Sequence, residues 1–322
     1  MINLKTAAIA AAATFAGTAF AQPAVIFDMG GKFDKSFNQS GFDGAERWKK
    51  ETGKTYLEFE VANPAQREQA MQRMAERGAN PIVGIGFAQA SAVEKVAKAF
   101  PKLNFVIIDS VVNLPNVQSI VFKEHEGSFL VGMMAAMASK TGKVGFIGGM
   151  DIPLIRKFQC GFEQGAKFAN GKAEVFANMT GTTPSAWNDP ARGAELAKAQ
   201  FAKGADVIFA AAGGTGVGVY QAAKDGGKLA IGVDSNQNHM QPGTMLTSMV
   251  KRVDVAVAGA FKGTKPGMSS LGLKEGGVDY AMDEHNAKLV SADMKGKVDA
   301  AKADIIAGKI SVIDYMAKNE CK

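Results

Sequence analysis

Residues that bind metals or carry out redox chemistry are sparse in this sequence. It has two cysteines, Cys160 and Cys321, and its three histidines, His125, His239 and His285, lie far apart. No Cys-x-x-Cys pair occurs, so a zinc site of closely spaced ligands is not expected. An isolated cysteine pair in an exported protein can form a disulfide, which here would tie the C-terminus to the middle of the chain. Two free thiols remain the alternative.

Sequence motifs of common catalytic sites are also absent. The chain contains neither Gly-x-Ser-x-Gly nor the Gly-x-x-x-x-Gly-Lys-[Ser/Thr] loop of nucleotide-binding proteins. A glycine run at residues 213–218 follows an expected strand and opens an expected helix, but Val219 occupies the last position of a dinucleotide-binding Gly-x-Gly-x-x-Gly pattern. We therefore expect no cofactor. The run can still bring a ligand close to backbone N–H groups, and a tight turn without ligand is the alternative.

Long apolar runs are missing after the first residues of the chain. Residues 1–21 carry one charge, Lys5, followed by an alanine-rich run and Ala19-Phe20-Ala21, which is typical of a cleaved signal peptide. The run is too short and too rich in alanine to predict a membrane-spanning helix. Gln22, rather than a cysteine, follows the cleavage point, so no lipid anchor is expected. We expect a soluble protein exported to the periplasm, cleaved after Ala21.

Charge of one sign is not concentrated in any part of the chain. The formal net charge is +6, but the lysines are spread along the sequence. This distribution is typical of a solvated surface and does not favour nucleic-acid binding. Removal of the leader leaves about 300 residues, which is enough for one large or two medium domains.

Strand-length apolar runs alternate with helical periodicity from residue 24 onward, which predicts an α/β fold with parallel sheets. The expected strands are residues 24–28, 55–61, 81–86, 104–109, 117–122, 143–148, 173–179, 206–211, 229–234, 245–249 and 278–282. The expected helices are residues 41–52, 64–78, 89–100, 127–140, 156–169, 190–204, 216–225, 254–263 and 292–308.

This alternation runs through two successive sets of elements, which predicts two Rossmann-like lobes. We expect the N-terminal lobe to contain residues 22–122 and about 251–282, and the C-terminal lobe to contain residues 123–250 and about 283–322. Two lobes joined by several crossing segments form a cleft that can close by hinge motion.

Acidic residues end three of the expected strands. Asp28, Asp109 and Asp234 each follow an apolar run, and Asp34 lies in the loop after the first strand. Ligands in open α/β sheets bind at the carboxyl ends of the strands, so these carboxylates are expected to face the cleft. Carboxylates accept hydrogen bonds and repel anions, which favours a neutral hydroxyl- or amino-rich ligand, or a cation, over a phosphate. Helix capping is the alternative role for any one of them.

Aromatic residues and one lysine complete the candidate site. Phe37, Phe42 and Trp187 are expected in loops, where an aromatic ring can stack on a flat or sugar-like ligand. Lys251 follows the strand at residues 245–249, where it could donate to a ligand oxygen or balance the acidic residues. A solvent-exposed lysine is the alternative.

Several short motifs in this order resemble the basic membrane protein family. The clearest is Asp34-Lys35-Ser36-Phe37-Asn38-Gln39 followed by Gly41. The others lie at residues 106–110, 145–149, 161–165, 187–190, 213–216 and 232–234, so that the resemblance covers nearly all of the chain after the leader. The members of this family are substrate-binding proteins of ABC transporters, and its characterised members are similar to purine-nucleoside receptors.

The resemblance implies a type I periplasmic-binding fold and a function. It implies a non-catalytic, monomeric receptor that binds a nucleoside such as adenosine, guanosine or inosine and delivers it to an ABC permease. Two other functions stay open on the residues alone. An exported nucleoside hydrolase would use the aspartate cluster, and a ligand-sensing protein would bind another small hydroxylated molecule.

The family pattern also implies a role for individual residues. Asp28 and Asp34 would bond the base edge, and Phe37 and Trp187 would enclose the base. The ribose hydroxyls would bind the side chains of Asp109, Asp234 and Lys251. Gly213 and Gly214 would supply backbone contacts. Ser36 and Asn38 would shape the loop.

Two positions depart from the family pattern. Many members of the family are lipoproteins with a cysteine where this chain has Gln22. The position that corresponds to Trp187 is often occupied by phenylalanine in those relatives.

Overall fold

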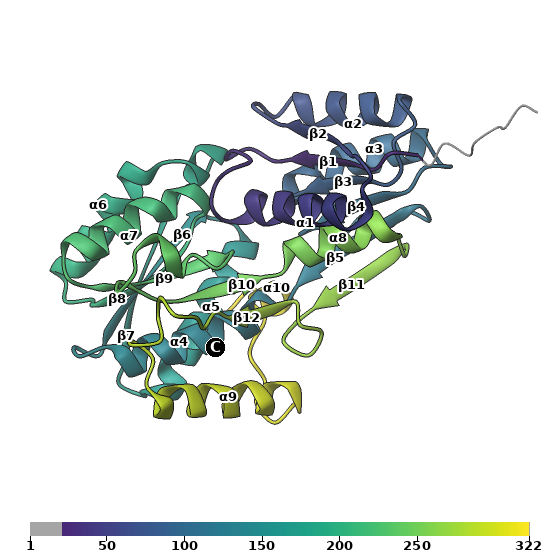
Figure 1. Ribbon diagram of the computed structural model, residues 1–322. Coiled ribbons are helices and arrows are strands. Elements are labelled where there is room, and N and C mark those ends of the chain that lie inside the picture. Colours follow the sequence, from purple (N-terminus) through teal and green to yellow (C-terminus); the bar gives the residue numbers. More distant parts are fainter. Residues whose placement is uncertain (1–20, 322) are drawn as a thin grey trace, which may run out of the picture.

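The computed structural model describes residues 21–321, which form two lobes, each built on a six-stranded sheet (Figure 1). The strand orders are β11-β5-β4-β3-β1-β2 and β12-β10-β9-β8-β6-β7. The alternating βα pattern of the sequence is therefore confirmed as an α/β fold with two sheets that are largely parallel. The predicted signal peptide lies, apart from Ala21, outside the described residues.

The first sheet is parallel throughout and is covered by helices on both faces. Its strands are β1 (Ala24–Phe27), β2 (Leu57–Glu60), β3 (Ile82–Ile85), β4 (Phe105–Ile108), β5 (Val117–Phe122) and β11 (Gly267–Leu271). Its helices are α1 (Phe37–Thr52), α2 (Gln66–Glu76), α3 (Ala90–Ala99) and α8 (Val253–Lys262). Every residue of β1, β3 and β4 is buried, which explains why these strands read as continuous apolar runs.

The second sheet repeats this arrangement with one antiparallel edge strand. Its strands are β6 (Lys143–Met150), β7 (Glu174–Gly181), β8 (Val207–Ala211), β9 (Leu229–Asp234), β10 (Met245–Lys251) and the antiparallel β12 (Val278–Tyr280). The helices of this lobe are α4 (Glu124–Ala138), α5 (Pro153–Ala169), α6 (Pro190–Ala202), α7 (Gly216–Asp225), α9 (Ala292–Ile306) and α10 (Tyr315–Lys318).

The chain crosses between the two sheets three times, and such crossing segments can act as hinges between the lobes. It crosses after β5, after β10 and between β11 and β12. Helix α8 packs against α1 and strand β11 pairs with β5, so both lie in the first lobe. Strand β12 pairs with β10 in the second sheet. The first-lobe segment therefore ends before β12, rather than at about residue 282.

Helix α1 begins earlier than its apolar periodicity predicts. It starts at Phe37, directly after Ser36, rather than at Gly41. Phe37 is therefore helical rather than in a loop, and Phe42 lies in the part of α1 that the periodicity already predicts. Trp187 ends a short 3-10 helix, η2 (Pro184–Trp187), that leads into α6.

Helices α4 and α5 pack with their backbones in close contact, and the C-terminal segment is fixed beside them. A side chain at Gly161 or Gly165 of α5 would overlap the carbonyl groups of His125 or Phe129 of α4. Cys160 of α5 forms a disulfide with Cys321, and their Cα atoms are 5.2 Å apart.

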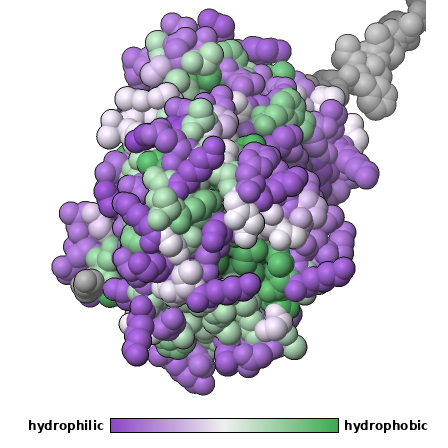
Figure 2. Space-filling model, turned by 90° about the vertical axis from the view of Figure 1, so that its left-hand side faces the viewer, coloured by the Kyte–Doolittle hydropathy of each residue, from purple (hydrophilic) through white to green (hydrophobic). Residues whose placement is uncertain are grey.

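None of the helices within residues 21–321 is both long enough and apolar enough to cross a membrane. Hydrophilic side chains cover most of the face shown in Figure 2, and apolar residues gather in small groups near its middle.

Candidate ligand-binding site

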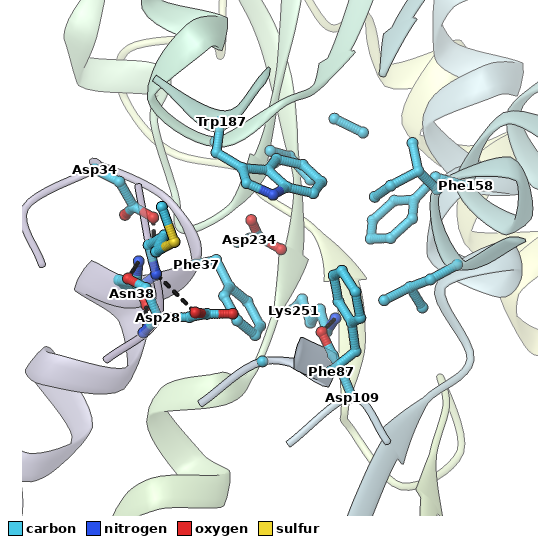
Figure 3. A pocket seen from close by; sticks show the side chains of 17 residues that line it. Asp28, Asp34, Phe37, Asn38, Phe87, Asp109, Phe158, Trp187, Asp234 and Lys251 are labelled. Carbon is cyan, nitrogen blue, oxygen red and sulfur yellow. Dashed lines mark hydrogen bonds and ion pairs between the residues drawn. The ribbon is translucent and has the colours of Figure 1, made fainter. Parts of the chain in front are cut away.

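A pocket opens between the lobes, at the carboxyl ends of strands from both sheets (Figure 3). The space inside it, including its mouth, is about 620 Å³. Its walls combine carboxylates, one lysine and several aromatic rings. The lining residues are Asp28, Met29, Asp34, Phe37, Asn38, Gly86, Phe87, Asp109, Leu154, Ile155, Phe158, Trp187, Ala211, Gly213, Val233, Asp234 and Lys251. Eight of the nine predicted site residues line it, and Gly214 is not among the lining residues.

Asp28 is held in place by an arginine that the sequence analysis did not single out. Its Oδ1 accepts hydrogen bonds from Arg67 Nε at 2.9 Å and from the backbone N–H of Met29 at 2.8 Å. A second guanidinium nitrogen of Arg67 lies 2.8 Å from the same oxygen. Because these contacts use Oδ1, the Oδ2 atom is available to a ligand donor.

Asp34 holds the N-terminus of helix α1. Its two oxygens accept backbone hydrogen bonds from Ser36, Asn38 and Gln39 at 2.8, 3.0 and 3.1 Å. Burial raises its pKa to about 6 although these hydrogen bonds favour the ionised form. The capping role is the alternative that the sequence left open, and it explains why α1 begins at Phe37.

Asn38 makes three hydrogen bonds within the loop that precedes α1. Its side-chain oxygen accepts from the Asp28 N–H at 3.2 Å, and its amide nitrogen donates to the carbonyls of Asp28 and Gly31 at 3.1 and 3.2 Å. The side chain therefore fixes the start of the loop that carries Asp34.

Asp109 and Lys251 form a buried ion pair from opposite lobes. Lys251 Nζ lies 2.6 Å from Asp109 Oδ2 and 2.9 Å from Oε1 of Glu124. Burial raises the pKa of Asp109 to about 6, whereas Lys251 and Lys157 hold the pKa of Glu124 near 2 despite its burial. Asp109 Oδ1 is buried and has no hydrogen-bond partner within residues 21–321. A buried acceptor without a partner is costly, so a ligand donor would be favourable at this atom.

The ion pairs continue behind the pocket to the C-terminal segment. Lys157 Nζ lies 3.0 Å from Glu124 Oε2 and 3.6 Å from Asp314 Oδ2, and it donates to the Phe122 carbonyl at 2.6 Å. The buried charges of Asp109, Lys251, Glu124 and Lys157 therefore each have an opposite charge beside them. This pairing offsets the cost of removing the charges from water.

Asp234 makes its polar contact across the lobes. Its Oδ2 accepts a hydrogen bond from Ser36 Oγ at 2.5 Å. Burial raises its pKa to about 6, and the positive charge of Lys251 opposes that shift. Asp109 and Asp234 have φ angles of 67° and 63°, so the chain turns sharply at the end of each strand and leaves the carboxylate at the pocket.

Four aromatic rings contribute to the apolar part of the wall. Trp187 lies on one side, with Phe37 and Phe87 on the opposite side and Phe158 between them at the end (Figure 3). Lys251 Nζ lies 5.0 Å from the centroid of the Phe37 ring, within the range of a cation–π contact. Phe42, also a sequence candidate, packs against Phe27 and Phe33 instead of lining the pocket.

Glycines of the second lobe make room for Trp187. A side chain at Gly149 of β6 would overlap the indole ring, and a Cβ at Gly213 or Gly214 would lie 3.3 Å from the Trp187 carbonyl oxygen. Gly213 also has φ 56°, a conformation that favours glycine. The glycine run therefore supports the aromatic wall of the pocket.

The residues that sequence analysis missed had weak local signals. Arg67 and Lys157 are cations in amphipathic helices, where lysine and arginine are normally solvated. Glu124 is in the first turn of α4, where an acidic residue is ordinary. Only tertiary packing shows that Glu124 and Lys157 are buried behind the pocket and that Arg67 is partly buried against Asp28.

The arrangement defines a class of protein. Two lobes of the type I periplasmic-binding fold enclose a pocket whose acidic groups and aromatic rings suit a small molecule that carries hydrogen-bond donors and a flat apolar part.

Comparison with known proteins identifies the family. Residues 21–314 match the Bmp model, described as ABC transporter substrate-binding protein PnrA-like, and the chain belongs to this family. The ABC transporter nucleoside-binding protein BmpA of Lactococcus lactis is 35% identical, over 90% of this chain and 88% of that protein. Basic membrane protein A2 of Borrelia garinii is 31% identical, over 90% and 88% of the two chains.

A solved structure supports the same assignment. The ABC transporter solute-binding protein from Aeropyrum pernix superposes with a TM-score of 0.84 at 30% identity, covering 91% of this chain and 93% of that one. Our protein is thus the substrate-binding component of an ABC transporter, which implies a small-molecule ligand and a permease partner. The resemblance and the fold class drawn from the sequence are confirmed.

Proposed function

We propose that this protein captures a nucleoside, of the purine class, in the interlobe pocket and delivers it to the permease without chemical change. The observation that carries the proposal is the position of Asp109: a buried carboxylate oxygen that has no partner among residues 21–321 lies in a pocket walled by aromatic rings. A nucleoside matches both features, since its flat base can stack on the aromatic rings and its sugar hydroxyls can donate to the carboxylate oxygen. The name of the Lactococcus relative points the same way.

The residue roles follow from the two ends of the ligand. The base would stack between Trp187 and Phe37, which contributes roughly 1–3 kcal/mol per aromatic contact by analogy with single-stranded nucleic acids. The sugar hydroxyls would donate to Asp109 and Asp234 and accept from Lys251. Asp28, through its Oδ2, would accept from the base edge.

The electrostatic balance of the pocket argues against phosphorylated ligands. Asp28, Asp34, Asp109 and Asp234 line it, whereas Lys251 is the one lysine or arginine among the lining residues that the structure describes. A phosphate would add negative charge to a desolvated acidic site, which is unfavourable. A nucleoside should therefore bind much more tightly than its 5′-monophosphate.

Calorimetry combined with product analysis tests the function. Protein refolded to remove any retained ligand is titrated with adenosine, guanosine, inosine, ribose and inosine monophosphate. Binding of a nucleoside to one site per chain, with no free base after prolonged incubation, is the expected result. Release of free base would identify the hydrolase, and binding of ribose but no nucleoside would identify a receptor for another hydroxylated molecule.

We also propose that the receptor is a monomer that diffuses freely in the periplasm after cleavage between Ala21 and Gln22. Intact-mass analysis of the protein from the periplasmic fraction should give the unlipidated mass of the chain beginning at Gln22. Light scattering should give the mass of one chain. A lipid-modified mass or a membrane-bound fraction would contradict the proposed location.

A further inference from the structure

Three side chains bridge the two lobes next to the pocket without lining it. Ser36 Oγ donates to Asp234 Oδ2 at 2.5 Å, and Ser235 Oγ donates to the Ser36 carbonyl at 2.9 Å. Gln237 Nε2 donates to the Lys35 carbonyl at 2.8 Å. Residues 35 and 36 lead from β1 into α1, and residues 234–237 follow β9, so all three hydrogen bonds join the first lobe to the second.

The second-lobe side of this contact is rigid. Gln237 is 1% exposed, and its Oε1 accepts from the Tyr220 hydroxyl at 2.7 Å and from the Val233 N–H at 2.8 Å. Both acceptor bonds lie inside the second lobe. The amide is therefore oriented by its own lobe, and its Nε2 is the group that reaches across to Lys35.

The first-lobe side is equally fixed. Asp34 accepts the backbone N–H of Ser36, and Lys35 has φ 62°, so the carbonyl groups of the turn have defined directions. Ser36 is fully buried. The two surfaces are thus pre-organised, and little conformational entropy is lost when they meet.

We propose that Ser36, Ser235 and Gln237 form a closure latch, which raises ligand affinity by holding the lobes together although none of its members touches ligand. Ligand affinity depends on the fraction of molecules that is closed, because an open cleft presents only half of the binding groups. Each latch bond exists only when the lobes meet, so it stabilises the closed form selectively. The claim that the latch raises ligand affinity rests on the proposed nucleoside function, whereas the claim that it holds the lobes closed does not.

The latch also has a consequence for one ligand group. Because Asp234 Oδ2 accepts the hydrogen bond from Ser36, the ligand would donate to the other carboxylate oxygen of Asp234. Ser36 is therefore a positioning residue for Asp234 as well as a bridge between the lobes.

Interlobe distance in the absence of ligand gives the direct test. Spin labels are attached through Asn63→Cys and Thr182→Cys, exposed positions just beyond the ends of β2 and β7, one in each lobe. The native cysteines are bonded to each other and do not react. Ser36→Ala and, separately, Ser235→Ala should shift the distance distribution of ligand-free protein to longer values.

Ser139→Ala provides a matched control. Ser139 Oγ donates to Asp206 Oδ1 at 2.5 Å, the same type and length of bond as Ser36 to Asp234, but within the second lobe. This variant should lose stability while its interlobe distance and its affinity stay as in the wild type. An equal opening in Ser139→Ala, or no opening in both Ser36→Ala and Ser235→Ala, would overturn the latch.

Affinity for adenosine and inosine is then measured in the same variants. Loss of one latch bond should raise the apparent Kd roughly two- to tenfold, as expected for the net value of one hydrogen bond. Opening without a change in Kd would contradict the claim about affinity. If the wild type binds neither nucleoside, the proposed function fails, while the ligand-free distances still decide whether the latch exists.

Discussion

Among single residues, Asp109 is expected to accept a hydrogen bond directly from the ligand. Its Oδ2 pairs with Lys251, and its Oδ1 has no partner within the described chain. Asp109→Asn keeps the size of the side chain, and asparagine tolerates the φ of 67° at this position. Loss of a charge-assisted hydrogen bond of about 1.5–3 kcal/mol should lower nucleoside affinity by roughly ten- to a hundredfold in a calorimetric titration.

Asp293→Asn is the matched control for this substitution. Asp293 pairs with Lys297 on the exposed surface of α9, far from the pocket-lining residues. It should bind nucleoside as the wild type does. Equal affinity of Asp109→Asn and wild type would show that the pocket carboxylate does not contact ligand.

The raised pKa values predict opposite effects of pH on binding and on stability. Burial raises the pKa of Asp109 and of Asp234 to about 6. Ligand hydroxyls bond best to the ionised carboxylates, so affinity should fall as pH is lowered from 7.5 to 5. Binding near pH 6 should release protons, which calorimetry in buffers of different ionisation enthalpy measures. Affinity that is unchanged or greater at pH 5 would contradict this account.

The same groups affect folding in the reverse direction. Their folded-state pKa lies above the usual aspartate value of 3.8, so the stability they contribute is complete below that value and is lost as pH rises to about 6. Glu124, with its pKa lowered to about 2, acts in the opposite sense between about pH 2 and 4.5. Weaker binding at pH 5 can therefore be separated from unfolding by a denaturation curve at each pH.

Among the elements, the α4–α5 pair depends on glycine where the helices touch. A Cβ at Gly165 would overlap the Phe129 carbonyl, whereas a Cβ at Gly296 of α9 would meet no atom within 4 Å. Gly165→Ala should lower the free energy of unfolding by about 1–3 kcal/mol through overpacking. Gly296→Ala should raise it by about 0.5–1 kcal/mol through helix propensity. Chemical denaturation measures both, and a stabilised Gly165→Ala variant would contradict the packing.

Sequence patterns predicted elements well where burial is complete. Strand β9 (Leu229–Asp234) has the predicted bounds, because it is an almost fully buried apolar run between clear turn residues. Helix α7 (Gly216–Asp225) also has the predicted bounds, although one side of it is exposed. Strand β11 was missed, since its sequence Gly-Met-Ser-Ser-Leu is a half-exposed edge strand without an apolar run. The start of α1 was also missed, because the signal lies in the hydrogen bonds of Asp34 rather than in periodicity.

At the site, strand-end acids could be predicted and their partners could not. Asp28, Asp109 and Asp234 end parallel strands, and the carboxyl ends of such strands lie at one edge of a sheet. Arg67 and Glu124 reach the site from helices, so their position depends on how elements pack. Such tertiary contacts cannot be predicted from the local pattern of a single sequence.

For the whole molecule, the disulfide fixes the C-terminal segment to the second lobe. Cys160 and Cys321 are 161 positions apart, so the bond closes a long loop. Cys321→Ser should lower the free energy of unfolding by about 2–4 kcal/mol, because the unfolded chain loses a constraint. A reducing agent should destabilise the wild type to the same extent and leave the variant unchanged. Equal denaturation curves for oxidised wild type and variant would contradict this role.

The central claim concerns the whole molecule: two lobes close on one nucleoside. A crystal structure of the refolded protein grown with inosine tests it most directly. The account predicts density for one inosine in the pocket, with the base between Trp187 and Phe37 and the sugar hydroxyls on Asp109, Asp234 and Lys251. Inosine bound outside the pocket, or with its sugar against the aromatic rings and its base on these carboxylates, would contradict the account.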